Sequence, residues 1–148
     1  MIKKRITGGN KMNVAVVYSS KSGHTKKIAE AMAKELGVEA KNILDKPVFN
    51  NIDLLLIGTG IYAGKIAPAL YPFLETIDSK TVKNAVIFST AMSPNVQTAT
   101  LRDLLTRRGI AVKQEEFLCK GKFLLFNTQH PNEEDVKNAV EFARKIAK

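Results

Sequence analysis

Apolar and polar positions along the chain form blocks that predict strands and helices in turn. Continuous apolar runs at 14–18, 52–57 and 85–88 have the composition of strands buried on both faces. Between and after these runs, apolar residues recur at helical spacing. The predicted helical stripes are Ile28, Ala29, Met32, Ala33 and Leu36; Leu70, Phe73, Leu74 and Ile77; Leu101, Leu104 and Leu105; and Val136, Ala139, Val140, Phe142, Ala143 and Ile146.

Glycine and proline mark the predicted helix boundaries. Gly37 and Gly109 are expected to end the first and third helices, because glycine accepts the left-handed conformation common after a helix. Pro68 fits the first turn of the second helix, and Pro131-Asn132 opens the last one. These boundaries leave room for two further strands.

The two further strands complete an alternating pattern. A short edge strand is expected at 39–44, ended by Lys46-Pro47, and a fifth strand at 110–118 that 123–126 continues after a break. Five strands and four helices without an internal repeat predict a doubly wound α/β sheet. Ligands bind such sheets beyond the carboxyl ends of the strands. The loops expected there are 19–25, 58–65 and 89–95.

The first of these loops has the chemistry of a phosphate site. It carries the hydroxyls of Ser20, Ser22 and Thr25 and the backbone N–H groups from Lys21 onward, at the start of a helix. Many hydroxyls without an arginine suit a terminal phosphate monoester. The alternative is that a Ser or Thr simply caps the helix, but a cap needs one such residue and not three around Gly23.

The second loop offers a flat ring. Gly58, Gly60 and Ala63 partly match a dinucleotide-binding fingerprint, but Pro68 places the helix start too late for that motif. Tyr62 is better interpreted as a surface on which a ligand ring stacks. The alternative is that Tyr62 packs against the next helix.

Residues 14–32 resemble the FMN-phosphate signature of flavodoxins, on Tyr18, Ser20, Gly23, Thr25 and Ala29. The resemblance covers residues 12–148. It implies a flavodoxin-like, doubly wound, five-stranded parallel sheet in the order 2-1-3-4-5, with helices on both faces. It also implies FMN held non-covalently, with its phosphate on the first loop and its ring between the other two.

The resemblance implies a set of cofactor-binding residues and no catalytic residue. They are Ser20, Lys21, Ser22, Gly23, His24 and Thr25 for the phosphate, and Ile61, Tyr62, Ala63, Gly64, Lys65, Thr90, Ala91 and Met92 for the ring. A backbone carbonyl at Ala63-Gly64 would accept a hydrogen bond from the reduced flavin, as in flavodoxins. No metal site is expected.

Several residues depart from the flavodoxin pattern. Lys65 stands where electron carriers often have an acid, and the third loop lacks their usual Tyr and acidic residues. His24 replaces the common Asn and is expected near the phosphate. These differences leave two functions open. One is an FMN-binding electron-transfer protein with a reductase or acceptor enzyme as its redox partner. The other is an FMN-dependent oxidoreductase acting on a quinone, porphyrinogen or NAD(P)H.

The net charge of +9 adds a third possibility, a basic module that binds nucleic acid or a partner. No nucleic-acid motif supports specific nucleic-acid binding. Residues 1–11 carry four of the positive charges and no acid, and we expect a flexible basic extension outside a domain at 12–148. The remaining charge suits a solvated surface or a docking face for an acidic partner.

Cys119 is the only cysteine, so an intrachain disulfide is excluded and a reducing cytoplasm is expected. Its side chain is interpreted as a small buried hydrophobe. No apolar run approaches the roughly 20 residues of a membrane-spanning helix. We expect a monomer or a weak dimer.

Overall fold

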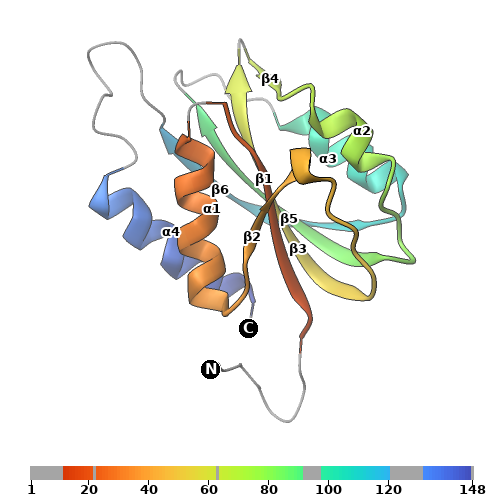
Figure 1. The fold of residues 1–148 in the computed structure, drawn as a ribbon, viewed down its shortest axis with the longest axis horizontal. Helices are drawn as coiled ribbons and strands as arrows, with labels where there is room; N and C mark the ends of the chain where they lie inside the picture. The colour runs from red at the N-terminus through yellow and green to blue at the C-terminus, as the bar shows by residue number, and fades with distance from the viewer. Residues whose placement is uncertain (1–11, 22, 63, 92–97, 121–131, 148) are drawn as a thin grey trace.

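The computed structural model describes residues 12–21, 23–62, 64–91, 98–120 and 132–147 (Figure 1). Five strands form a parallel sheet in the order β2-β1-β3-β5-β6. They are β1 (Val14–Ser19), β2 (Ala40–Asn42), β3 (Ile52–Tyr62), β5 (Val82–Ala91) and β6 (Ala111–Lys120). This confirms the predicted doubly wound sheet, to which a two-residue strand, β4 (Lys65–Ile66), adds an antiparallel pairing with the end of β3.

Helices cover both faces of the sheet (Figure 1). One face carries α1 (His24–Leu36) and α4 (Glu133–Ile146), which pack side by side. The other carries α2 (Leu70–Leu74) and α3 (Ala99–Arg107). A short 3₁₀ helix, η1 (Ile43–Asp45), follows β2.

The central strands are buried on both faces, and alternate residues enter opposite cores. Val16, Leu54, Leu56, Val86 and Phe88 pack with α1 and α4. Their neighbours along the strands pack with α2 and α3; these are Ala15, Val17, Leu55, Ile57, Ala85 and Ile87. This period of two is the geometry of a pleated strand, and two cores explain why the strands are continuously apolar.

The predicted helix boundaries are confirmed at three ends. Gly37 ends α1 in the left-handed conformation, with φ of 74°. Gly109 has φ of 82° just after α3. Asn132 caps α4 with a reciprocal capping box. The Asn132 side chain accepts from the Asp135 N–H, and the Asp135 carboxylate accepts from the Asn132 N–H.

Other boundaries were wrong. β3 runs on through Gly58 to Tyr62 and β5 through Ser89 to Ala91, so much of the predicted loops 58–65 and 89–95 is strand. The edge strand expected at 39–44 is limited to β2, with η1 in place of its end.

The second helix is also shorter than its apolar stripe predicts. Pro68 precedes α2, whose cap is Ala69, and Ile77 lies beyond its end although its side chain is buried. The predicted extension at 1–11, the residues 92–95 of the third loop and the continuation at 123–126 lie outside the described residues.

Gly58 lets β3 lie directly against a buried aromatic ring. A Cβ at Gly58 would be 2.2 Å from the nearest ring atom of Phe88, its register partner on β5. Phe88 is fully buried in the packed core, so its ring cannot move aside to make room for a methyl group.

We therefore expect Gly58→Ala to lower the free energy of unfolding by about 2–3 kcal/mol through overpacking. Urea unfolding measures this. In the double variant with Phe88→Leu, the total loss should be smaller than the sum of the two single losses, because the smaller side chain makes room for the methyl group. A Gly58→Ala protein as stable as the wild type would contradict this account of the contact.

Candidate functional site

The register of the three central strands brings their hydroxyl residues to one level. Ser19 on β1 pairs with Thr59 on β3, and Thr59 pairs with Ser89 on β5. All three side chains are buried. This row marks where the apolar strands end, and the segments that follow it converge at the carboxyl edge of the sheet.

The start of α1 has no side-chain cap. Its N-cap is Gly23, with φ of 91° and no capping side chain, which speaks against the alternative that a Ser or Thr caps this helix. The first helical hydrogen bond joins the Lys27 N–H to the Gly23 carbonyl at 3.0 Å. The N–H groups earlier in this turn are directed at the loop, as at any helix start. Ser20 Oγ accepts from the Gly23 N–H at 3.0 Å and closes the loop.

The half-buried Tyr62 reaches across to this loop. Its hydroxyl accepts from the Lys21 N–H at 3.2 Å, and the Lys21 ammonium lies 4.8 Å from the centre of its ring. A Cβ at Gly60 would be 2.5 Å from the Tyr62 hydroxyl, so only glycine allows this position. Sequence reasoning missed this role of Gly60. The signal was a glycine within a strand, which often marks a close approach.

Three buried threonine hydroxyls hold the carboxyl edge together. Thr25 Oγ1 and Thr90 Oγ1 are 2.6 Å apart and join the start of α1 to the end of β5. Thr59 Oγ1 donates to the Gly60 carbonyl at 2.7 Å and accepts from the Ala67 N–H at 3.1 Å, which fixes the β3–β4 hairpin. Buried hydrogen bonds therefore anchor both the start of α1 and the β3–β4 hairpin.

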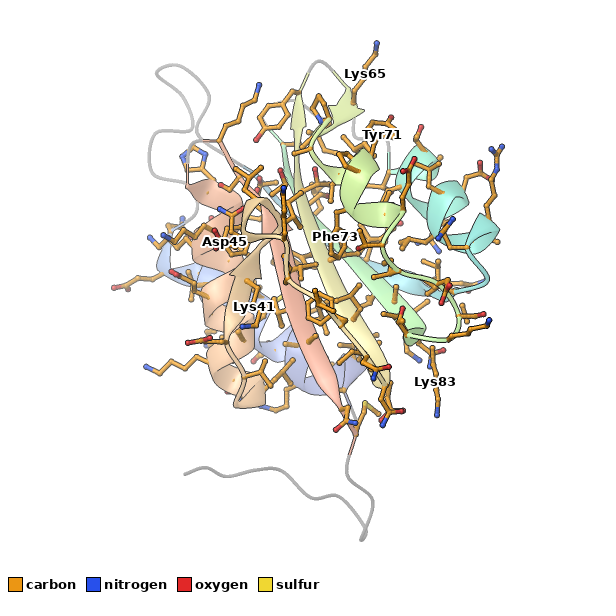
Figure 2. The ribbon with its side chains drawn as sticks, turned by 45° about the vertical axis from the view of Figure 1, so that its right-hand side comes forward. Lys41, Asp45, Lys65, Tyr71, Phe73 and Lys83 are labelled. Atoms are coloured by element: carbon orange, nitrogen blue, oxygen red, sulfur yellow. The ribbon has the colours of Figure 1, made fainter. Side chains whose placement is uncertain are left out.

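The remaining predicted residues are placed differently. Ile61 and Ala91 are buried in the core under α2 and α3. Gly64 makes the hairpin turn with φ of 78°, and Lys65 projects from it into solvent (Figure 2). His24, half-buried, begins α1. The predicted site residues Ser22, Ala63 and Met92 lie outside the described residues.

The structure thus brings a group of hydrogen-bond donors next to an aromatic ring. The donors are the backbone N–H groups at the start of α1 and the hydroxyl of Ser20, and the ring is that of Tyr62. Among the described residues, no three His, Cys, Asp or Glu side chains gather as a metal ion would require. The helices in the same part of the chain are too short or too polar to span a membrane.

Comparisons with known proteins agree with this geometry. A family model described as a flavodoxin domain matches residues 15–127. An uncharacterised protein of Methanocaldococcus jannaschii is 40% identical over 151 residues, which cover 93% of this chain and 99% of that protein.

Solved flavodoxin structures share the fold. A flavodoxin from the domain Archaea has a TM-score of 0.68 at 17% identity, over 93% of this chain and 100% of the other. Flavodoxin 2 from Bacillus cereus, in its oxidised form, has a TM-score of 0.68 at 21% identity, over 91% and 97%.

Cys119 lies on β6 beside Thr90 and is buried. Burial raises the pKa of its thiol to about 12, and the charge and hydrogen bond of the nearby Asp135 carboxylate add to this increase. The thiol therefore stays protonated near neutral pH and is no nucleophile.

We expect Cys119 to resist thiol reagents at pH 8 in the folded protein and to react once urea unfolds the chain. The raised pKa also makes folding favour the protonated thiol, so this contribution to stability is complete below about pH 9 and is lost as the pH rises towards 12. Colorimetric thiol titration measures the reactivity. Rapid labelling of the folded protein would contradict the assignment.

Proposed function

We propose that this chain binds FMN non-covalently at the carboxyl edge of its sheet. The chain belongs to the flavodoxin family and is a flavodoxin-like electron-transfer protein. The flavin supplies the redox chemistry when bound, and the protein holds it and adjusts its potential. The observation that carries this proposal is the glycine-capped start of α1, with its loop closed by Ser20 and flanked by Tyr62.

The phosphate end of the proposed site fits a terminal monoester. The first turn of α1 supplies backbone donors and the positive end of the helix dipole. Ser20 and Lys21 continue the same loop, and Lys21 adds a cation beside it. We assign the phosphate to Ser20, Lys21, Ser22, Gly23, His24 and Thr25.

The ring end of the proposed site is the β3–β4 hairpin together with the end of β5. Tyr62 offers an aromatic face, and Gly64 gives the turn a backbone freedom that few other residues have. We assign the ring to Ile61, Tyr62, Ala63, Gly64, Lys65, Thr90, Ala91 and Met92. Because Ile61 and Ala91 turn their side chains into the core, they would contact the ring through their backbone.

We further propose that residues 12–148 form the FMN-binding domain and that residues 1–11 lie outside it. As an electron-transfer protein, the chain would pass electrons to a separate redox partner protein. The single buried thiol suits a reducing cytoplasm.

Titration with flavins tests the proposal. The purified protein should quench the fluorescence of FMN. It should bind FMN at least about tenfold more tightly than riboflavin, because riboflavin lacks the phosphate that the start of α1 would hold. The FMN-loaded protein should not turn over NAD(P)H with a quinone. Unchanged flavin fluorescence would overturn the proposal, whereas rapid NAD(P)H turnover would favour an enzyme.

Thr90→Val should weaken FMN binding about tenfold, the effect of losing one hydrogen bond, because Thr25 loses the hydroxyl that holds the loop to β5. Valine has the shape of threonine and keeps the strand. Thr90→Ser, which retains a hydroxyl, is the matched control and should bind FMN nearly as the wild type does. Equal affinities for all three proteins would show that the Thr25–Thr90 bond does not shape the site.

Lys65→Glu should lower the reduction potential of the bound flavin by several tens of millivolts, because a nearby positive charge favours the negative charge gained on reduction. Anaerobic titration with a reference dye measures the potential. Lys80 is an exposed lysine just before β5, at the other end of the sheet. The control variant Lys80→Glu makes the same change in net charge and should leave the potential almost unchanged. Equal shifts in both variants would contradict a local effect of Lys65.

A further inference from the structure

We propose that the lysines around the carboxyl edge of the sheet form a docking surface for the acidic face of a redox partner protein. This lysine rim is defined as Lys21, Lys26, Lys27 and Lys65, all exposed. The inference rests on the proposed function, because it names the chemistry of the partner that meets the flavin site.

The rim lysines lie on three neighbouring segments of the structure. Lys21 lies over the ring of Tyr62, and Tyr62 pairs with Lys65 across the β3–β4 hairpin. Lys26 and Lys27 follow in the first turns of α1. The four lysines therefore surround the phosphate loop and the hairpin that the proposed site uses.

Negative charge is absent from the loop that carries Lys21 and from the hairpin that carries Lys65. None of the 14 acidic residues lies at 19–29 or at 59–74. Lys21, Lys26 and Lys65 have no acidic side chain as an ion-pair partner among the described residues. No ion pair with a described residue therefore offsets their positive charge, although Glu30 follows Lys26 by one turn of α1.

The opposite end of the sheet differs. There Lys83 Nζ lies 3.4 Å from Asp53 Oδ1, and the same carboxylate group accepts from the Asn13 N–H at 2.9 Å. These contacts lower the pKa of Asp53, so its charge is present to offset that of Lys83. Figure 2 shows Lys65 and Lys83 at the two opposite ends of the molecule. The charge of Lys83 is thus offset by a carboxylate, whereas no ion pair offsets that of Lys65 among the described residues.

The cofactor alone does not account for this charge. A phosphate monoester carries up to about two negative charges, which the start of α1 and Lys21 already meet. Lys65 lies beyond Tyr62 on the separate hairpin and so extends the positive surface away from the phosphate loop. An acidic protein surface complements such a rim and gains in association rate from it.

A protein partner suits the rim better than a nucleic acid. All its cations are lysines, whereas recognition of phosphate groups favours the two-pronged guanidinium of arginine. The rim also encircles a proposed redox site rather than a groove-reading helix. Nucleic-acid binding is therefore an outcome that the test must separate.

NMR titration of the ¹⁵N-labelled, FMN-loaded protein tests the proposal. The probes are a small acidic ferredoxin, the basic cytochrome c and a short DNA duplex, each at low salt. We expect the ferredoxin to shift the amide signals around Lys21, Lys26 and Lys65, and 300 mM NaCl to abolish most of this effect. Shifts caused mainly by cytochrome c or by DNA would overturn the proposal.

Charge reversal locates the surface. Lys26→Glu and Lys65→Glu should each weaken ferredoxin binding about three- to tenfold at low salt. Lys80→Glu changes the net charge equally but lies outside the rim, and it should weaken binding less than twofold. Equal losses in all three variants would mean that net charge alone attracts the ferredoxin, and the docking surface would be refuted.

The same titration separates the two proposals. If the protein binds no FMN but the ferredoxin still docks on the rim of the flavin-free chain, the proposed cofactor fails and the docking surface stands. If FMN binds tightly and the ferredoxin shifts no signals at the rim, the docking surface fails and the cofactor stands.

Discussion

The register of the three central strands is the constraint on which the rest of the structure depends. Because Ser19, Thr59 and Ser89 lie opposite one another, the continuous apolar runs of β1, β3 and β5 end at one level. Below that level alternate residues fill two separate cores, and a slip of one position would exchange every side chain between them. Above it, the start of α1, the β3–β4 hairpin and the end of β5 meet at a single edge. The candidate site is thus a consequence of how the cores are packed.

The sequence predicted the fold well because the fold depends largely on local patterns. Apolar runs predicted the central strands, and Gly37 predicted the end of α1. The ends of the strands were predicted poorly because pairing and packing between strands decide them. Gly58 and Gly60 are typical of loops, yet both lie within β3, where an aromatic side chain fills the space beside each. The hydrogen bond between Thr25 and Thr90 joins residues 65 positions apart, and no local pattern indicates such a contact.

The phosphate loop and the ring loops are linked below the surface. Thr25 connects α1 to β5, while Tyr62 on β3 accepts from the backbone of Lys21. The bond between Thr25 and Thr90 is buried, whereas the contact between Tyr62 and Lys21 is exposed, so the buried bond mainly sets the separation between the two ends of the proposed cofactor site. Buried hydrogen bonds of this kind are costly to break, because the group left behind loses both water and partner. A rigid separation favours a ligand whose phosphate and ring are themselves a fixed number of bonds apart, and it lowers the entropy lost on binding.

The lysine rim connects the choice of partner with the strength of the proposed electron carrier. Lys65 favours the negative charge of a reduced flavin, so the isolated protein should be a weaker reductant than one with an acid at this position. An acidic partner that docks on the rim brings negative charge towards the same place and offsets that of the lysine. By linkage, if docking disfavours reduction, then reduction must weaken docking by the same free energy. The oxidised carrier would therefore hold an acidic partner more tightly than the reduced carrier does. Such an arrangement suits a protein that receives electrons from its acidic partner and then leaves it.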